Sequence, residues 1–504
     1  MSSSPLRQQT IHLLRTNKVK QAHTVLVSEL RNNPENHEAW YLMANINAHI
    51  GDFSKACKII DKALTLTSNA EYLIAKAKYL CLDGQSAACS TVLSTLSISA
   101  LNNPTDLDTL ANIYTRLGEY EQAHACYIKA LANAKTPGDI LVNAAISYTI
   151  MAQPERSLTL LQQAIASSEH NPRAHFLFAE HAPIKLADEH HQQVTLLAQQ
   201  ETDAHSKQYL HHAAALQLEK QAKFHAAFDA FAASKECVAA SVHFDATKHR
   251  NFCQQIMTLP ALAPSDSHAS PVFIAGMPRT GTTLLDKLLC QSPHLASLGE
   301  LNEIAQGVKH QSGESTPAVL STQIIGSAAQ QSTQDLAKRY QHRYNTLKGG
   351  VQHGCDKQPF NFYYLDFIVS AFPTAKIILM VRDKADTCIA NFRQLYQTQS
   401  PFHHYAFKLE HISAFYDDYR ALANHFAQKY PNNVTLQHYE QLVTEGEATM
   451  RNLFEFCQLP YPEDCLDFYK HPSACATASK LQIRQPLNTR SIGYWRNYAQ
   501  KYQP

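Results

Sequence analysis

Residues 271–290 read PVFIAGMPRTGTTLLDKLLC. A short apolar run ends in glycine, a polar loop follows, and leucines then recur at helical spacing, at Leu284, Leu285, Leu288 and Leu289. This order predicts a strand, a loop and a helix. A loop that leads into a helix N-terminus presents unpaired backbone N–H groups and the positive end of the helix dipole, and both attract phosphate. The stretch therefore predicts an anion site at the end of a strand.

Two glycines frame this loop. Gly276 and Gly281 give the backbone freedom it needs, and their spacing is that of the nucleotide-triphosphate loop. That loop continues with Lys and a hydroxyl residue, which hold the β- and γ-phosphates and magnesium, whereas this chain has Thr282 and Thr283. The departure argues against a nucleotide kinase or triphosphatase. Arg279 and the two hydroxyls suit a shorter donor, and no metal is expected.

The longer stretch PVFIAGMPRTGTTLLDKLLCQSPHLASLGELNEI resembles the 5′-phosphosulfate loop of sulfotransferases, whose donor is 3′-phosphoadenosine 5′-phosphosulfate (PAPS). Four further segments follow in the family's order, so the resemblance covers residues 271–497. The chain is similar to bacterial tetratricopeptide-linked sulfotransferases and, more distantly, to tyrosylprotein sulfotransferases. The resemblance implies that the loop binds the donor through Arg279, Thr280, Gly281, Thr282 and Thr283.

The second segment, Leu298-Gly-Glu300-Leu-Asn-Glu303, lies where the family has the glutamate that takes the acceptor's proton. A neutral hydroxyl is a poor nucleophile, and a nearby carboxylate can accept its proton as the bond to sulfur forms. The resemblance implies Glu300 as this base, with Glu303 as the alternative.

The third segment, Cys355-Asp-Lys357-Gln-Pro-Phe-Asn-Phe, resembles the family's Asp-Lys-x-Pro-x-Asn-Phe stretch. Negative charge grows on the oxygen that bridges phosphorus and sulfur as that bond breaks. A fixed ammonium stabilises this charge in the transition state more than in the ground state. We therefore expect Lys357 and Arg279 to act as catalytic cations.

The fourth segment is an apolar strand, AKIILMV, followed by Arg382 and a helical stretch, and it resembles the family's 3′-phosphate site. An arginine can bind a phosphate through two parallel hydrogen bonds. The family usually has a serine eight residues later, but position 390 is Ala390. Asn391 is the substitute we expect to bind the donor there.

The fifth segment, His438-Tyr439-Glu-Gln-Leu-Val, resembles a strand and helix of the family, and Tyr439 would lie against the adenosine. The tail that follows it, from Thr477 through Trp495, resembles a loop that closes over the nucleotide, with Ser479 and Arg484 as donor-binding residues. The family commonly has a basic residue just before the tryptophan of this segment, and here Tyr494 stands in that place.

The first half of the chain is repetitive. Small residues recur at intervals of 34, 33, 34, 34 and 70, at Ala22, Ala56, Cys89, Ala123, Ser157 and Ala227. The last interval is about two periods and suggests a degenerate copy near residues 173–204. This spacing resembles the tetratricopeptide repeat over residues 5–240. Stacked helix pairs offer a concave surface for a peptide or protein, and a dimerisation or spacer role, including a homodimer, stays open.

The composition excludes some partners. The chain has 44 Lys and Arg against 43 Asp and Glu among its 504 residues, so no global field favours nucleic acid. The start has no apolar signal region and no stretch is long enough to span a bilayer. Twelve cysteines show no zinc-type spacing. We therefore expect a cytoplasmic protein with reduced thiols and no membrane span.

Apolar strands alternate with helical stretches in the second half, which predicts a parallel sheet between helices. The predicted architecture is an all-α tetratricopeptide solenoid at residues 1–257, a linker at 258–270, and a P-loop-type three-layer α/β sulfotransferase domain at 271–504. The expected reaction moves a sulfuryl group from PAPS to a hydroxyl acceptor.

The acceptor stays open between peptide tyrosine, a saccharide, a lipid headgroup and a small phenol, and the repeats favour a protein or peptide. Its specificity is expected to lie in residues 305–350 and 395–410. Two alternatives remain. One is a non-catalytic scaffold with a degenerate sulfotransferase domain, motivated by Ala390 and Tyr494. The other, less favoured, is a P-loop nucleotide kinase.

Overall fold

The computed structural model describes residues 4–16, 18–135, 138–167, 171–314, 316, 318–470 and 485–503. Contacts divide the chain into two compact units. The first consists of Met1–Thr136 with Ser315–Ala318, and the second of Pro137–Glu314 with Val319–Pro504. The predicted domain boundaries at 257 and 271 stay predictions.

The first unit is built from helix pairs. The predicted small residues Ala22, Ala56, Cys89 and Ala123 are all buried in the second helix of a pair, which lets the two helices approach closely. The helices are α1 (Pro5–Arg15), α2 (Val19–Asn32), α3 (His37–His49), α4 (Phe53–Leu66), α5 (Ala70–Leu82), α6 (Ser86–Ser94), α7 (Pro104–Arg116) and α8 (Tyr120–Asn133).

The second unit opens with three more pairs. Ser157 and Ala227 again lie buried in second helices. A helix pair also occupies the region of the expected degenerate copy, where buried His190 takes the interior position and lies 3.0 Å from His175. The pairs are α9 (Gly138–Ile150) with α10 (Pro154–Ser167), α11 (Pro172–His181) with α12 (Ala187–Gln200), and α13 (Ala204–Lys220) with α14 (Phe224–Glu236).

A five-stranded parallel sheet follows, with the order β2-β3-β1-β4-β5. All five strands point the same way, so the segments that leave them meet at one edge, where ligands bind in open α/β sheets. The predicted parallel sheet is thus confirmed. The strands are β1 (Val272–Gly276), β2 (Leu295–Gly299), β3 (His353–Asp356), β4 (Lys376–Val381) and β5 (Val434–His438).

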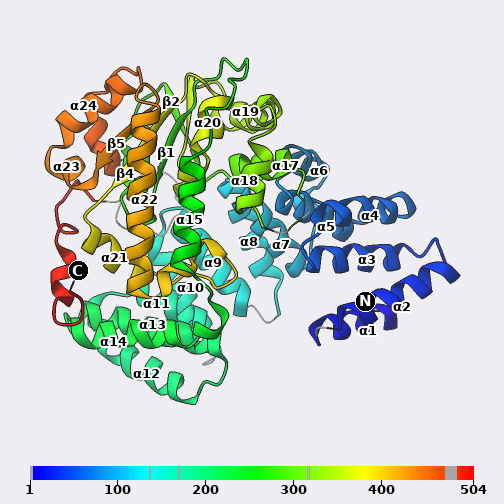
Figure 1. Ribbon diagram of the computed structural model, residues 1–504. Coiled ribbons are helices and arrows are strands. Elements are labelled where there is room, and N and C mark those ends of the chain that lie inside the picture. Colours follow the sequence, from blue (N-terminus) through cyan, green and yellow to red (C-terminus); the bar gives the residue numbers. More distant parts are fainter. Residues whose placement is uncertain are drawn as a thin grey trace. The chain divides into compact units, whose positions relative to one another are not determined.

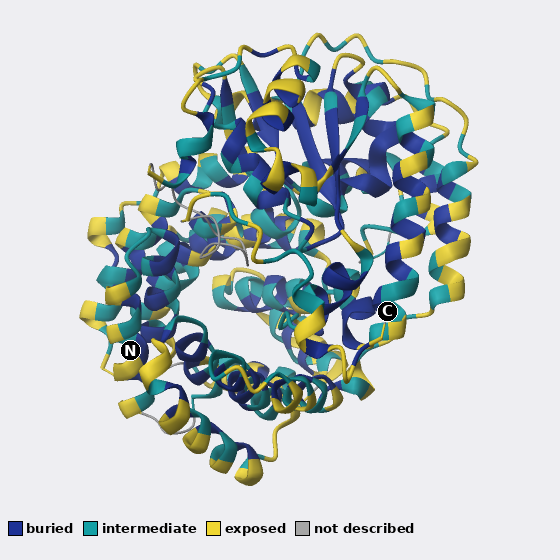
Figure 2. Ribbon diagram, turned by 90° about the vertical axis from the view of Figure 1, so that its left-hand side faces the viewer, coloured by how far each residue is buried: buried dark blue, intermediate teal, exposed yellow. Residues whose placement is uncertain are grey.

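Helices cover both faces of the sheet, as Figure 1 shows, and the strands between them are largely buried in Figure 2. Alternate residues of β1 illustrate the two cores: Ile274 packs with Leu285 of α16 (Thr282–Leu289), while Phe273 packs on the other face. The first face carries α16, α23 (Tyr439–Thr444) and α24 (Gly446–Phe456). The second carries α17 (Glu303–Ser312), α19 (Gln334–Lys348), α20 (Leu365–Ala371) and α22 (Leu409–Lys429).

The segment between the repeats and the sheet is held by hydrogen bonds. Helix α15 (Ala246–Met257) packs against α22. In the following stretch, Ser265 donates from its backbone N–H to the Ser370 carbonyl at 2.8 Å, and Ser370 donates to the Ala263 carbonyl at 2.5 Å. The predicted linker residues therefore lie along the part of the chain that contains the sheet.

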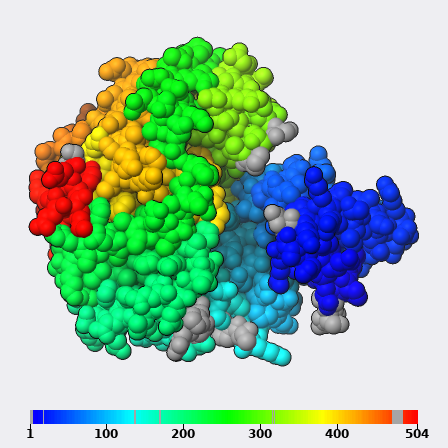
Figure 3. All heavy atoms as spheres, turned by 60° about the horizontal axis from the view of Figure 1, so that its bottom comes forward, coloured from blue at the N-terminus to red at the C-terminus, as the bar shows by residue number. Residues whose placement is uncertain are grey.

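The C-terminal residues return to the repeat helices. The short helix η8 (Tyr494–Tyr498) packs on α14, and Lys501 pairs with Asp229. Figure 3 shows this segment in red against the green surface of the repeat helices. None of the described helices combines the length and the apolar character needed to cross a membrane.

Candidate active site

The loop between β1 and α16 needs its two glycines. Gly276 has φ +155° and Gly281 has φ +101°. A Cβ on Gly276 would lie 2.8 Å from the Met380 carbonyl oxygen, and one on Gly281 would lie 2.7 Å from Cδ2 of Tyr439. Arg279 also has a positive φ, +71°, which costs about 1–2 kcal/mol for a residue with a side chain. The loop thus holds a strained conformation at the edge of the sheet.

The loop's threonines differ in their surroundings. Thr280 is buried and donates its hydroxyl to the Met277 carbonyl at 2.7 Å, so it stabilises the loop itself. Thr282 and Thr283 open helix α16, and its N-cap residue is Gly281, which supplies no capping side chain. Uncapped N–H groups at a helix N-terminus are suited to bind an anion.

Glu300 and Lys357 form an ion pair in the structure, with Nζ of Lys357 donating to Oε1 of Glu300. Glu300 follows β2 and Lys357 follows β3, and the backbone N–H of Lys357 donates to the Gly299 carbonyl at 2.9 Å. The Lys357 side chain is 1% exposed, whereas that of Glu300 is 44% exposed. The pair therefore places a buried ammonium behind an accessible carboxylate.

Glu303 lies differently. It begins helix α17, its side chain is 14% exposed, and it lies 3.9 Å from Nε of Arg343. Glu300, and not Glu303, is among the described residues that line the cavity in front of the loop.

Arg382 follows β4 and ties several segments together. Its Nη1 donates to the Arg279 carbonyl at 3.0 Å and its Nη2 to the Ser491 carbonyl at 2.5 Å. Its Nε is buried and has no hydrogen-bond partner among the described residues. The guanidinium lies 4.8 Å from the centre of the Tyr439 ring, and Tyr439 begins the segment after β5.

Asn391 is buried and its amide is occupied. Nδ2 donates to the Pro278 carbonyl at 2.8 Å, and Oδ1 accepts from the hydroxyls of Tyr396 and Tyr405. Its neighbour Ala390, on helix α21 (Lys384–Phe392), lines a cavity. The two residues thus point to different surroundings, as a 100° turn between successive helical residues requires.

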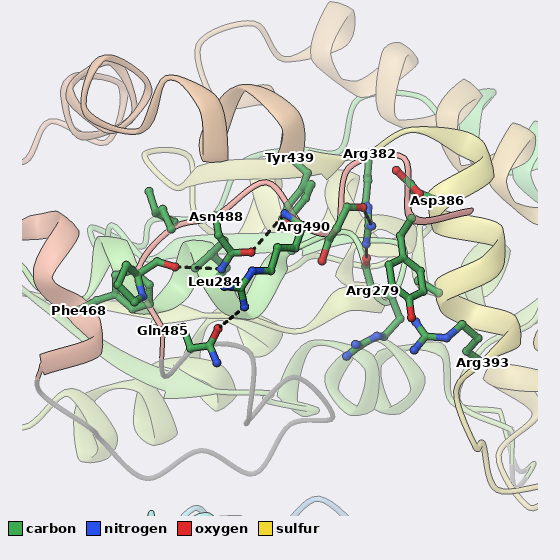
Figure 4. A pocket seen from close by; sticks show the side chains of 16 residues that line it. Arg279, Leu284, Arg382, Asp386, Arg393, Tyr439, Phe468, Gln485, Asn488 and Arg490 are labelled. Atoms are coloured by element: carbon green, nitrogen blue, oxygen red, sulfur yellow. Dashed lines mark hydrogen bonds between the residues drawn. The ribbon is translucent and has the colours of Figure 1, made fainter. Parts of the chain in front are cut away.

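Two cavities meet at Arg279. The first, of about 270 Å³, lies beside α21 and the C-terminal segment, and Figure 4 shows its lining. It includes Arg279, Gly281, Leu284, Arg382, Asp386, Ala390, Arg393, Tyr439, Phe468, Arg490 and Tyr494. The second, of about 400 Å³, is lined by Arg279, Thr282, Thr283, Glu300, Gln306, Val319, Phe360, Tyr364, Tyr396, Ser400, Phe402 and His403, among others. We call them the arginine cavity and the aromatic cavity.

Burial changes the pKa values of side chains that line the two cavities. It lowers the pKa of Arg279, and the positive charges of Arg393 and Arg382 act in the same direction. It also lowers the pKa of His403 to about 4, so this side chain is neutral near pH 7. The described lining of the aromatic cavity therefore offers one arginine and little other positive charge.

Sequence reasoning missed three charged residues of the arginine cavity, Asp386, Arg393 and Arg490. Asp386, Ala390 and Arg393 are spaced i, i+4 and i+7, which places them on one helix face. The spacing from Ala390 is therefore a signal in the sequence that indicates both charged residues. Arg490 lies within the segment that resembles the family's final loop, and no local pattern singles it out there.

Ser479 and Arg484 lie outside the described residues. Two groups of described residues could hold a metal ion, namely His249 with Cys253 and Asp418, and Asp286 with Cys290 and Cys355. Neither group contributes a lining residue to the two cavities.

Comparison with known proteins gives matches in both halves of the chain. Residues 271–463 match the protein-family model described as the sulfotransferase family. Residues 9–71 and 107–141 match models of the tetratricopeptide repeat. The matched repeats and the matched transferase region agree with the helix pairs and the parallel sheet described above.

Several individual proteins are also similar. An uncharacterized protein of Aquifex aeolicus (strain VF5) is 29% identical over 57% of this chain and 39% of its own length. Protein-tyrosine sulfotransferase 1 of Danio rerio is 26% identical over 44% of this chain and 65% of its own, and protein-tyrosine sulfotransferase of Drosophila melanogaster is 23% identical over 44% and 46%. The chain thus spans less than two thirds of each of these three relatives.

Proposed function

We propose that this chain, whose residues 271–463 match the sulfotransferase family model, transfers a sulfuryl group from PAPS to a hydroxyl acceptor. The observation that carries the proposal is the position of the 277–281 loop. It lies between a cavity rich in arginine and a cavity that holds an accessible carboxylate, and Arg279 lines both. A transfer reaction needs two such neighbouring cavities, because a positively charged one binds the anionic donor and the other binds the neutral acceptor beside a base.

The donor would bind in the arginine cavity. The uncapped N-terminus of α16 and Arg279 would hold the phosphosulfate, while Arg382 would bind the 3′-phosphate through its unpaired Nε edge. Tyr439 packs against Gly281 and would support the nucleoside. The requirement for PAPS itself rests on the family and on these positive charges.

Asn391 would support the donor site without touching the donor. Both ends of its amide are engaged by protein groups, one of which is the Pro278 carbonyl in the loop. We therefore propose that Asn391 positions the loop, which modifies the direct donor contact expected from the sequence.

The reaction is an in-line displacement at sulfur. The acceptor oxygen forms a bond to sulfur, the bond from sulfur to the bridging oxygen breaks, and adenosine 3′,5′-bisphosphate leaves with the electron pair of that bond. Glu300 would take the acceptor proton, and Lys357 and Arg279 would stabilise the charge on the bridging oxygen. The Glu300–Lys357 ion pair holds the base beside the cation before substrates arrive.

The acceptor would enter the aromatic cavity. Phe360, Tyr364 and Phe402 line it, and the Tyr396 and His403 rings stack with centroids 4.4 Å apart. Both segments expected to set acceptor specificity contribute, with Val319 from the first and Ser400 from the second. A flat phenolic group fits such a lining, which favours tyrosine, and two relatives are named protein-tyrosine sulfotransferases. The repeats would bind the protein or peptide that carries it.

The test is transfer of label from PAPS to a panel of tyrosine peptides, phenols, saccharides and lipids. We expect label on a phenolic hydroxyl, with tyrosine peptides as the best acceptors. Label transfer to saccharide alone would overturn the tyrosine proposal and keep the sulfotransferase. Binding of adenosine 3′,5′-bisphosphate without transfer to any acceptor would favour the scaffold alternative.

A further inference from the structure

The arginine cavity contains an arginine that the proposed reaction has not used. Arg393 immediately follows α21 and lies on the same helix face as Asp386 and Ala390. The short side chain of Ala390 leaves space beside it in the cavity. Figure 4 shows Arg393 with Arg279 and Arg382 at one end of this pocket, while Arg490 turns toward Gln485 at 3.4 Å.

A carboxylate from the repeat array holds Arg393. Glu219, near the end of α13, accepts from Nε of Arg393 at 2.5 Å and from Nη2 at 2.7 Å. The Glu219 side chain is 7% exposed and also accepts from the hydroxyl of Tyr498. The guanidinium of Arg393 lies 4.6 Å from the centre of the Tyr494 ring. These contacts fix the orientation of Arg393 from behind.

The repeat helices also hold the backbone next to Arg393. Phe228 of α14 stacks on Phe392 with ring centroids 5.1 Å apart. Lys235, also on α14, donates to the Gln394 carbonyl at 2.6 Å. Gln397 donates to the hydroxyl of Tyr209 on α13 at 2.9 Å. The position of this segment is therefore set by α13 and α14.

The charge of the cavity matches a ligand with more than one phosphate. The described residues that line it include four arginines and one carboxylate, Asp386, which accepts from the backbone N–H groups of Gly493 at 2.6 Å and Trp495 at 3.0 Å. A guanidinium has five N–H donors in a planar fork. Glu219 binds Nε and Nη2 at one edge of the Arg393 fork, and Nη1, on the other edge, has no hydrogen-bond partner within the described ranges.

We propose that Arg393 binds the 3′-phosphate of the donor together with Arg382, and that Glu219 of the repeat helix α13 is its positioning residue. The repeat array would then complete the donor site as well as carry the proposed protein-binding role. This inference rests on the proposed function, because it takes the donor to be a 3′-phosphorylated nucleotide.

The test compares two nucleotides by calorimetry on the full chain. Adenosine 3′,5′-bisphosphate carries the 3′-phosphate and adenosine 5′-monophosphate lacks it. We expect Arg393→Gln to lower the affinity for the bisphosphate by about 10- to 100-fold, the range for loss of a hydrogen bond to a charged group. The affinity for the monophosphate should change by less than about twofold. A variant that folds poorly would lose both ligands alike, so the ratio of the two affinities reports on the 3′-phosphate.

The role of Glu219 is tested by a double-mutant cycle. In the wild-type background, we expect Glu219→Gln to lower the affinity for the bisphosphate by about 3- to 10-fold. In the Arg393→Gln background, the same substitution should lower that affinity by less than about twofold. Asp229→Asn is the matched control, because it breaks an exposed ion pair to Lys501 between α14 and the same C-terminal segment. It should change neither affinity.

Three outcomes contradict these claims. If the wild type binds neither nucleotide, the proposed function fails and this inference fails with it. If the wild type binds the bisphosphate but Arg393→Gln leaves the ratio of affinities unchanged, the assignment of Arg393 alone is wrong. If Glu219→Gln weakens the bisphosphate equally in both backgrounds, Glu219 does not act through Arg393.

Discussion

The ion pair of Glu300 and Lys357 is the centre of the site at the scale of single residues. The two side chains come from the ends of neighbouring strands, and one is buried while the other is accessible. A carboxylate that must accept a proton from an incoming hydroxyl needs access to the acceptor cavity. A cation that stabilises the leaving group needs a fixed position, and burial supplies it.

Glu300→Gln is therefore expected to lower the rate of label transfer by about 10²- to 10⁴-fold, the usual contribution of a general base. The dissociation constant for adenosine 3′,5′-bisphosphate should stay within about twofold, since Glu300 lines the aromatic cavity. Glu303→Gln is the matched control and should retain most of the rate. If Glu303→Gln greatly lowers the rate of label transfer and Glu300→Gln does not, the base is Glu303 and the assignment of Glu300 is wrong.

Gly281 offers a second test at the residue scale. In Gly281→Ala the new methyl group would meet the Tyr439 ring at 2.7 Å, so the loop or the ring must move. We expect bisphosphate affinity to fall by at least about tenfold. Gly313 has a similar positive φ, +71°, with no atom within 4 Å of an added Cβ. Gly313→Ala should cost about 1 kcal/mol of stability and leave affinity unchanged. Equal affinities in the two variants would contradict the proposed role of the loop.

Among the elements, α14 contributes a buried lysine to the junction with the part of the chain that contains the sheet. Lys235 donates to the Gln394 carbonyl and lies 4.7 Å from the centre of the Phe407 ring. Burial lowers its pKa from 10.5 to about 7. The unfolded chain therefore binds more protons than the folded chain between pH 7 and 10.5, and stability rises with pH across this window.

Lys235→Met should remove this part of the pH dependence. We expect the free energy of unfolding of the wild type, relative to the variant, to rise on the order of a few kcal/mol between pH 7 and pH 10. Denaturant unfolding of both proteins across that range measures the difference. If the two proteins show the same slope, Lys235 is charged in the folded state, which would contradict its exclusion from water.

The elements were the most predictable part of the fold. The 34-residue period identified the second helix of each pair because only a small side chain fits at the helix contact, as Ala56 and Ala123 show. In the degenerate copy, His190 occupies the interior position beside His175. The repeat pattern predicts a small side chain at this position, so it could not predict a pair of histidines. The strand, loop and helix at residues 271–290 followed from apolar pattern and glycine spacing.

For the whole molecule, the sequence indicated where candidate residues gather but not how they pair. Parallel strands bring their C-terminal ends to one edge, so Glu300, Lys357, Arg382 and Tyr439 could be expected there, although their roles stay predictions. The occupied amide of Asn391 depends on two tyrosine rotamers that no local pattern specifies. Glu219 and Arg393 are 174 positions apart, one in a repeat helix and the other after a helix that flanks the sheet. Only the three-dimensional structure therefore reveals that they pair.

The Glu219–Arg393 pair is one of several contacts between the last repeat helices and the candidate site. Helices α13 and α14 contact the segment that runs from the arginine cavity to the aromatic cavity, through Arg393, Gln394 and Gln397. The last repeats thus lie against the candidate site as part of its framework. The protein-binding role of the repeats and the possibility of a homodimer stay predictions.

Calorimetric titration of the full chain with adenosine 3′,5′-bisphosphate decides whether the arginine cavity is a site for a 3′-phosphorylated nucleotide. We predict saturable binding with a micromolar dissociation constant, at least about tenfold tighter than that of ATP with magnesium, because the loop has threonine where triphosphate loops have lysine. Absence of binding at high micromolar bisphosphate, or tighter binding of ATP with magnesium, would contradict the account.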